Sequence, residues 1–348
     1  MATSSTPQAK LHFILAREAH AAVIFRRGPG KLVQIVKWNT DTDTFEPGQW
    51  FKGRIFEDRS DISPAGTKLL YFAEKITPVT LKDPNYTTHW TAVSKLPYLT
   101  ALALWPNGDR TCKSTYVQAK DMEGGGVFVS DTELMLNILF TDTSPHPEHL
   151  PKGLSVITGR DWADRRPVLQ TDMDDWTEEQ FQQHLQFLSL ILSRCESDRN
   201  GWEYVPVFYT PFGRLLKARI ASNEPVDRTW LREAAASVMH LPTLPPDPGT
   251  KLQTLSKECA VQPGIRLIKR MVGNKIHDFK IIDAAGGEFA IAGATCADWD
   301  QSGRLVYASD GKVFSGEVTA SGIAERELAD FNGNKFEPID SPEWAKSW

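Results

Sequence analysis

Two short runs of acidic and amide residues carry the alternating oxygen ligands that calcium-binding loops use. The first run is Asn39, Asp41 and Asp43, and the same spacing recurs near the other end of the chain at Asp330, Asn332 and Asn334. An EF-hand loop would add a mid-loop glycine and a distal bidentate glutamate, and neither follows here. Asp and Asn side chains also cap their own backbone in tight turns. We therefore interpret both runs as turns and expect no metal site.

Other residue types suited to catalysis lack the spacing that catalysis needs. His146-Pro147-Glu148-His149 offers metal ligands but not the HExxH arrangement of a helix face, so an exposed loop is the simpler interpretation. Gly124-Gly125-Gly126 lacks the Gly-Lys-Ser/Thr ending of a phosphate-binding loop, and no Gly-x-Ser-x-Gly elbow is present. The sequence assigns no catalytic residue and indicates no cofactor.

Five residues are candidates for a binding surface. The polar run Asp161 to Arg166 (DWADRR) could bind an acidic or planar partner from a loop, although a solvated turn is the simpler interpretation. Trp105 and Trp299 adjoin turns that recur along the chain and could line one face of the molecule, although interior packing would also explain them. The candidate binding residues are Trp105, Arg160, Asp161, Trp162 and Trp299.

Composition narrows the class of protein. The 348 residues are 41% hydrophobic and 24% charged, as in ordinary globular chains, and the net charge of −5 argues against a nucleic-acid partner. Apolar segments fall well short of the roughly 20 residues of a membrane span. No secretory signal is seen in the N-terminal run MATSSTPQAK. The four cysteines (Cys112, Cys195, Cys259, Cys296) are far apart, which fits a reducing compartment, so we expect a cytoplasmic protein.

Most of the chain has the pattern of short strands and turns. We expect residues 1–15 to be a flexible tail. His20 to Arg27 and Lys31 to Trp38 are apolar runs separated by Gly28-Pro29-Gly30, which predicts a hairpin. Further β runs between residues 44 and 75 bring the total to four between about residues 20 and 75.

The middle of the chain predicts helices. Trp176 to Ser197 has apolar residues at three- and four-residue spacing and a capping box formed by Thr177 and Gln180. Arg228 to His240 predicts a second helix, and the Pro-rich run Leu241 to Gly249 cannot continue it.

Two pairs of similar segments connect the ends of the chain. Arg59 to Lys75 and Cys296 to Ser309 share an acidic residue, a polar turn with glycine, and a strand with matched Leu and Tyr residues. Asp310-Gly311 is a hairpin signal directly after the second copy. Phe45-Glu46-Pro47 and Phe336-Glu337-Pro338 form the other pair, each following alternating Asp or Asn residues.

The segment DISPAGTKLLYFA resembles the repeat of TolB-type and WD40-like β-propellers, S-P-D-G-x-x-L-x-[FY]. Ser63, Pro64, Gly66, Leu69 and Tyr71 match that pattern, and Ala65 replaces the usual Asp. The resemblance implies an all-β fold with helical insertions, a β-propeller of about six (five to seven) degenerate blades. Residues 16–348 would form a single propeller domain with a helical insertion near 172–245, closed by the strand at residues 20–27. The alternative is a separate helical module at about 170–250.

The resemblance bears on fold more than on activity, because propellers host many functions. We expect a non-catalytic scaffold for protein–protein interaction. The alternative is a hydrolase or lyase with its site at the mouth of the propeller channel. Both a monomer and an oligomer fit the sequence.

Overall fold

The structure is a computed structural model, and residues that are far apart in the chain meet in it. It describes residues 8–28, 30–81, 88–107, 124–136, 152–157, 177–179, 181–182, 203–205, 219, 222–238, 252–272, 275–319 and 321–348.

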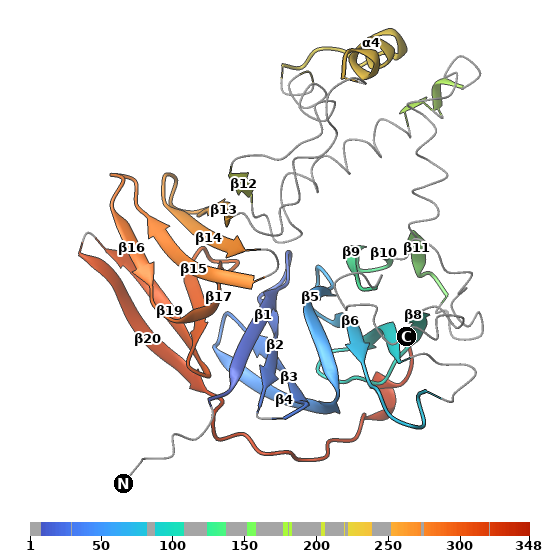
Figure 1. Ribbon diagram of the computed structural model, residues 1–348, viewed down its shortest axis with the longest axis vertical. Helices are drawn as coiled ribbons and strands as arrows, with labels where there is room; N and C mark the ends of the chain where they lie inside the picture. The colour runs from blue at the N-terminus through green and yellow to red at the C-terminus, as the bar shows by residue number, and fades with distance from the viewer. Residues whose placement is uncertain are drawn as a thin grey trace. The chain divides into compact units, whose positions relative to one another are not determined.

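Five β-sheets make up most of the described chain (Figure 1). Sheet A contains β1 (Lys10–Leu15), β2 (Ala21–Arg27), β3 (Leu32–Asn39) and β4 (Thr44–Lys52). Sheet B contains β5 (Arg54–Ile62), β6 (Lys68–Glu74), β7 (His89–Lys95) and β8 (Ala103–Asn107). Sheet C contains β9 (Gly126–Ser130), β10 (Glu133–Leu136) and β11 (Ser155–Ile157). Sheet D contains β12 (Glu203–Val205), β13 (Leu252–Glu258), β14 (Arg266–Val272), β15 (Lys275–Ile282) and β16 (Glu288–Ile291). Sheet E contains β17 (Ala294–Trp299), β18 (Leu305–Ser309), β19 (Lys312–Thr319) and β20 (Gly322–Asp330).

Each sheet pairs strands that are neighbours in sequence, and the pairing is antiparallel except between β10 and β11. The prediction of a mainly β chain is thereby confirmed. The grouping of the strands differs from the prediction, because sheet A already begins at Lys10 and sheet B begins at Arg54. The four β runs expected between residues 20 and 75 therefore belong to two sheets.

The chain separates into two compact units, whereas the sequence analysis expected one domain. Residues 1–162 and 292–348 form the first unit, which holds sheets A, B, C and E. Residues 163–291 form the second, which holds sheet D and α4 (Arg228–Val238). The second unit thus contains a five-stranded sheet as well as the helix that the alternative of a helical module expected.

The inner strands β2 of sheet A and β6 of sheet B are buried on both faces, which explains their continuous apolar runs. In β2 (AAVIFRR) every residue except the last is buried. Alternate residues face different neighbours: Val23 and Phe25 pack in a cluster with Leu69 and Tyr71 of sheet B. Ile24 instead joins a cluster with residues of sheet E. A third cluster links sheet B to sheet C through Trp105 and Phe128.

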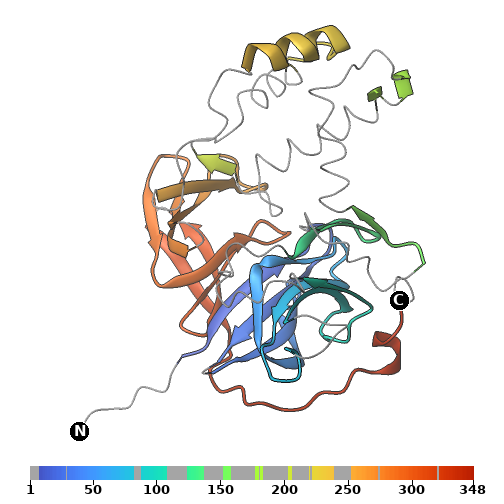
Figure 2. The same ribbon diagram turned by 45° about the vertical axis from the view of Figure 1, so that its right-hand side comes forward.

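The first strands of the four sheets in this unit lie next to one another. β1 contacts β17 and β5, and β5 contacts β9, so the order of sheets is E, A, B, C (Figures 1 and 2). The earliest and latest parts of the chain therefore meet. Cys296 and Val306 share a core cluster with Leu11 and Phe13, and the backbone N–H of Ala9 donates to Asn332 at 2.9 Å.

The structure of residues 10–27 differs from two predictions made from the sequence. Residues 10–15 were assigned to a flexible tail, but they form β1 and pair with β2 along its length. The alternation of Leu11, Phe13 and Leu15 supplies the apolar contacts that hold this strand. The strand at residues 20–27, expected to close the ring, is the second strand of sheet A, and within the described part of the chain it pairs with β1 and β3 alone.

The recurring turns have the same hydrogen bonds. Gly66 donates its N–H to the carbonyl of Ser63 at 2.8 Å, and Gly303 donates to Asp300 at 2.9 Å. The Ser63 hydroxyl and the Asp300 carboxylate accept further backbone N–H groups of their own turns. The first pair of similar segments is therefore a real structural repeat, in which the polar side chain stabilises the turn.

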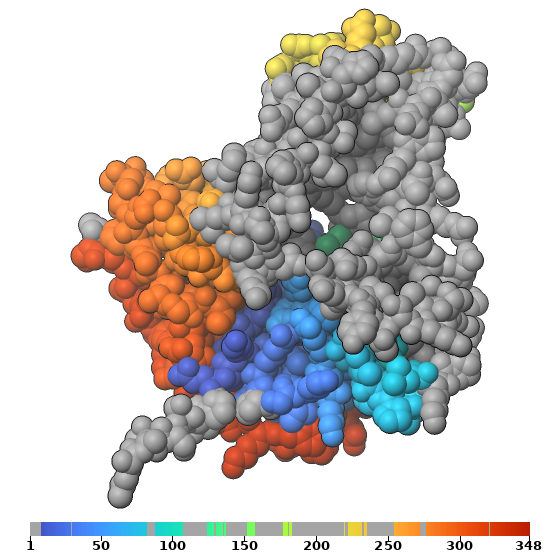
Figure 3. Space-filling view, in the orientation of Figure 1, coloured from blue at the N-terminus to red at the C-terminus, as the bar shows by residue number. Residues whose placement is uncertain are grey.

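The second pair of similar segments is not a structural repeat. Phe45-Glu46-Pro47 lies inside β4, whereas Phe336-Glu337-Pro338 follows the last strand and belongs to no helix or strand. The C-terminal segment (residues 335–348) runs from sheet E past sheets A and B, as the red chain in Figures 1 to 3 shows.

The second unit contains the helix predicted at residues 228–240, which is α4. Asp227 caps it by accepting the N–H of Trp230 at 2.8 Å. Most of the helix predicted at residues 176–197 lies outside the described residues. Its described part is helical at Glu178, Glu179, Phe181 and Gln182, and Arg228 lies 4.9 Å from the centre of the Phe181 ring.

Candidate functional site

The residues proposed for binding from sequence do not form a described surface. Trp105 lies inside β8, not in a turn, and is fully buried in the cluster between sheets B and C. Trp299 ends β17 and is also buried. Both therefore serve packing, because a large aromatic side chain at these positions fills space between strands. Arg160, Asp161 and Trp162 lie outside the described residues, as does the His146–His149 run.

The first calcium-like run is a hairpin turn between β3 and β4. Asn39 accepts the backbone N–H groups of Asp41 and Thr42 at 3.0 and 3.2 Å, as expected of an Asx turn. Asp43 has a φ of 52° and directs its carboxylate at arginines. Among the described residues no group of three or more His, Cys, Asp or Glu side chains could hold a metal ion.

At Gly124 and Gly125 the backbone lies so close to sheet B that a side chain would not fit. A Cβ atom on Gly124 would lie 2.2 Å from the Phe72 ring, and one on Gly125 would lie 2.2 Å from the Arg59 carbonyl. Gly125 also donates its N–H to Thr91 at 2.8 Å. The glycines therefore let the chain that enters β9 lie directly against sheet B.

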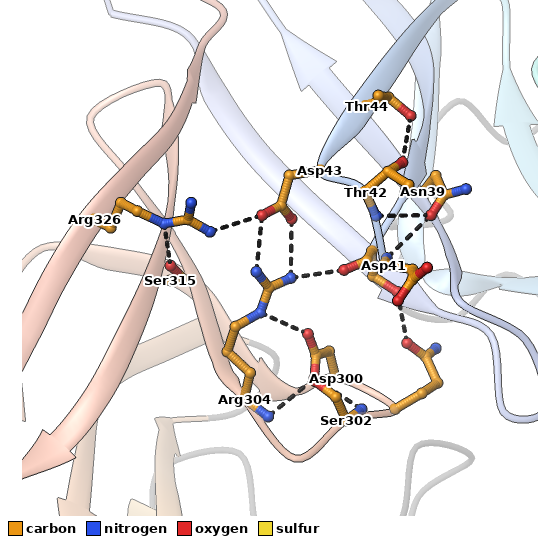
Figure 4. A network of polar contacts seen from close by, with 12 residues as sticks. Asn39, Asp41, Thr42, Asp43, Thr44, Asp300, Ser302, Arg304, Ser315 and Arg326 are labelled. Atoms are coloured by element: carbon orange, nitrogen blue, oxygen red, sulfur yellow. Dashed lines mark hydrogen bonds and ion pairs between the residues drawn. The ribbon is translucent and has the colours of Figure 1, made fainter.

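A polar network joins sheets A and E (Figure 4). Arg304 donates two hydrogen bonds to Asp43, at 2.8 and 2.9 Å, in the bidentate geometry that favours Arg over Lys. The same guanidinium donates to Asp300 and to the carbonyl of Thr40, each at 2.8 Å. Arg326 approaches Asp43 from β20 at 2.9 Å.

This network stabilises the contact between sheets A and E and is not a reaction site. Burial alone would raise the pKa of Asp43, but the hydrogen bonds and charges of Arg304 and Arg326 outweigh it and hold that pKa below its usual value. Asp43 is thus a carboxylate with both oxygens engaged. A side chain in this state contributes rigidity and is not available as a base.

A different cluster gathers at one edge of sheet B. Arg54 of β5 is directly opposite Glu74 of β6, and Glu74 is directly opposite His89 of β7. The His89 imidazole lies 2.9 Å from the Glu74 carboxylate through Nε2 and 2.9 Å from the Thr88 hydroxyl through Nδ1. We call Arg54, Glu74, His89 and the adjoining turn at residues 75–81 the sheet B rim.

The imidazole in this rim is neutral near pH 7. Burial lowers the pKa of His89, and the charges of Arg54 and Arg59 lower it further, against the opposing influence of Glu74. A neutral ring next to a carboxylate donates through Nε2 and accepts the Thr88 proton at Nδ1. The order hydroxyl, imidazole, carboxylate is the order found in nucleophilic catalysis. The His89 side chain is only 7% exposed, however, so access to it is narrow.

Arginines and aromatic rings stack beside this pair. The guanidinium of Arg54 lies 4.3 Å from the centre of the Phe56 ring, and that of Arg59 lies 5.5 Å from the Phe72 ring. Phe56 and Phe72 contact each other with centroids 5.0 Å apart, and Phe72 stacks on His89. The rim therefore presents cationic groups on a fixed aromatic base.

The turn at residues 75–81 follows β6 and presents apolar side chains to solvent. Ile76 is 54% exposed, Val79 74% and Leu81 67%. The turn itself is well braced: Thr77 and Thr80 exchange backbone-to-hydroxyl hydrogen bonds of 2.9 and 3.1 Å. The Thr80 hydroxyl also donates to the Lys75 carbonyl at 2.7 Å.

Sequence reasoning missed this rim for an identifiable reason. His89 looked isolated in the chain, and Glu74 lies fifteen positions before it. Strand register alone makes them partners, because β6 and β7 pair antiparallel. The available signal was the run Ile76 to Leu81, whose aliphatic residues alternate with Thr and Pro instead of following a strand or helix period.

No described helix is long and apolar enough to cross a membrane. Comparison of the chain with protein-family models, with curated proteins and with solved structures found no match.

Proposed function

We propose that this chain is a β-propeller-type scaffold that binds a partner protein in the cytoplasm. Sheets E, A, B and C would be neighbouring blades, in the order that the contacts of their strands give. Two observations support this arrangement: first strands lie side by side, and the first sheet contacts the last. Neighbouring meanders that bury both faces in this way are the building principle of propellers.

The single observation that carries the binding function is the apolar turn of the sheet B rim. Three large aliphatic side chains project from one short turn, each more than half exposed. Grouped exposed apolar residues mark interaction sites more often than scattered ones do. The hydrogen bonds of Thr77 and Thr80 hold the turn before any partner arrives, so little conformational entropy is lost on binding.

The chemistry of the rim indicates the kind of partner. Ile76, Val79 and Leu81 would enter an apolar groove, and the exposed Arg54 beside them would face an acidic group. The partner surface is therefore apolar with an acidic border.

The test is quantitative co-purification with the tagged full-length chain. The double variant V79S/L81S should lose the captured protein, because it removes apolar contact without changing charge. The matched control is V261S, which alters an aliphatic side chain that is 57% exposed and lies outside the rim. Equal capture by all three proteins would reject the rim as the binding site.

Catalysis is the alternative, favoured by the contacts among Thr88, His89 and Glu74. The binding proposal expects no turnover of p-nitrophenyl esters of short acids by the purified chain. Turnover that H89Q abolishes and V79S/L81S leaves unchanged would establish the hydrolase instead. The low exposure of His89 is the reason for placing binding first.

A further inference from the structure

The C-terminal segment (residues 335–348) lies on sheets A and B as a bound peptide would. Gln49 of β4 donates through Nε2 to the Ile339 carbonyl at 2.8 Å and to the Ser341 hydroxyl at 3.0 Å. Lys95 of β7 donates to the Trp344 carbonyl at 2.8 Å. Ile339 and Ser341 lie in a stretch without helix or strand, whereas Trp344 lies in a short 3-10 helix (Glu343–Ala345), and the segment pairs with no described strand.

Aromatic side chains complete the contact. Trp344 meets Tyr98 edge to face, with centroids 5.5 Å apart, and lies 5.8 Å from the Lys95 ammonium group. Trp348 lies 4.8 Å from the ammonium group of Lys68 and packs against the cluster between sheets B and C. Gln49, Lys68, Lys95, Tyr98 and Thr100 form what we call the seat; Thr100 contacts the Ser341 hydroxyl.

Burial shows that the segment rests on the surface. Within residues 335–348 only Ser341 and Ala345 are buried, and Trp344 remains 54% exposed. The clusters that join sheet A to sheets B and E contain no residue of the segment. Sheet A therefore keeps its main apolar contacts with sheets B and E when the segment leaves.

Charge favours the same pairing. The segment carries Glu337, Asp340 and Glu343 against Lys335 and Lys346, whereas the seat carries the two cations Lys68 and Lys95. An acidic peptide on a cationic seat gains electrostatic attraction that an unrelated segment would lack.

We propose that the seat is a peptide-binding site and that residues 335–348 are its built-in ligand. The segment occupies the seat in cis and blocks the same contact in trans. This site is separate from the sheet B rim, so it does not depend on the function proposed above. The ligand class is a short peptide with more acidic than basic side chains, a 3-10 turn, and two tryptophans spaced as Trp344 and Trp348 are.

The test measures binding of a fluorescent peptide of sequence 335–348 to two proteins. A chain ending at Asn334 should bind it saturably, because Asn332 and Asn334 still fasten the end of sheet E. Full-length protein should bind it roughly 10- to 100-fold more weakly, because a tethered ligand competes at an effective concentration of about 1 mM. Circular dichroism establishes that the shortened chain is folded.

Variants distinguish specific binding of the peptide at the seat from nonspecific binding. Q49A/K95A in the shortened chain should weaken binding, and the peptide with W344A/W348A should bind at least tenfold more weakly. K52A is the matched control, since Lys52 is an exposed cation of the same strand as Gln49. Saturable binding that ignores these changes, or no binding by a folded shortened chain, would overturn the proposal.

If the shortened chain does not fold, a second experiment tests the proposal with the full chain. A protease site placed between Asn334 and Lys335 of the full chain is cut after folding. The proposal expects excess unlabelled peptide to displace the cut segment while the remaining chain stays folded. Unfolding on displacement would show that the segment is part of the core and would overturn the proposal.

Discussion

Arg304 shows how single charged residues are used in this protein. Its guanidinium makes four hydrogen bonds, to Asp43, Asp300 and Thr40, and the acceptors on sheet A are 261 and 264 positions away in the chain. Such contacts are costly to break. When one partner is removed, the other stays buried without its hydrogen bond, and nothing then offsets the free-energy cost of its removal from water. Asp43, which belongs to the calcium-like run of the sequence, thus holds two sheets together.

Replacing Asp43 with Asn should destabilise the protein at neutral pH by about 1.5–3 kcal/mol, the range for hydrogen bonds to charged groups. Folding depresses the pKa of Asp43, so its contribution is present at pH values above the unfolded pKa of about 3.9. It disappears as the pH falls through the lower folded pKa. Urea unfolding of wild type and D43N between pH 7 and 3 should therefore show converging stabilities.

D41N is the control for this prediction, because Asp41 is an exposed neighbour in the same turn. Its effect on unfolding should stay within about 0.5 kcal/mol at each pH, as for other surface positions. A D43N penalty that does not change with pH would contradict the assignment.

Trp105 behaves as a packing residue, and its replacement tests that directly. W105A should cost about 3–5 kcal/mol of unfolding free energy, because a fully buried aromatic side chain leaves a cavity between sheets B and C. Trp344, which is 54% exposed, provides the comparison, and W344A should cost under about 1 kcal/mol. If the two variants unfolded at the same denaturant concentration, the interior role of Trp105 would be wrong.

At the scale of elements, the turns between first and second strands set the geometry of neighbouring sheets. Gly66 has a φ of 71°, and it also lies against sheet A, where a Cβ atom would come 2.4 Å from Ala21. The turn therefore has two requirements, a positive φ and the absence of a side chain. The Ser63 hydroxyl stabilises the same turn by accepting the backbone N–H groups of Thr67 and Lys68.

Gly66→Ala should accordingly destabilise more than Gly30→Ala. Gly30 also has a positive φ, of 85°, but nothing lies within 4 Å of an added Cβ atom. The Gly30 change should cost about 1–2 kcal/mol for the backbone alone, and the Gly66 change should add the cost of the contact with Ala21. Thermal unfolding of both variants measures the difference, and equal melting temperatures would refute it.

At the scale of the whole molecule, the first unit is built from both ends of the chain. The cluster between sheets A and E takes Leu11 and Trp38 from one end and Val306 and Phe331 from the other. The face of sheet A that turns away from sheet B is therefore buried only when sheet E is present. This arrangement makes the early residues dependent on residues that are synthesised last.

A fragment of residues 1–162 should therefore fail to unfold cooperatively. Without residues 292–348 it exposes the apolar face of sheet A, and we expect increased binding of a hydrophobic dye and a shallow urea transition. Adding residues 292–348 as a separate chain should restore part of the cooperativity. A sharp transition of the fragment alone, at the midpoint of the full chain, would show that sheet E is dispensable.

The sequence alone determined the strands and turns of this protein, because they depend on neighbouring residues. The hairpins at Gly28–Gly30 and Asp310-Gly311 and the repeated turn at Ser63 and Asp300 follow from glycine dihedrals and short polar side chains. Helix α4 lies within the run Arg228 to His240, which predicts a helix and is followed by prolines that cannot continue it. Such patterns are local, so one sequence is enough to read them.

Only the tertiary structure decided which strand begins each sheet, which tryptophans are buried and which charges meet. Sheet A starts at β1 because Phe13 packs on Trp38 and on residues of sheet E. His89 becomes a partner of Glu74 through strand register, and Asp43 becomes a partner of Arg304 through the meeting of sheets A and E. These contacts depend on how sheets pack across long separations, and no local pattern of residues encodes that packing.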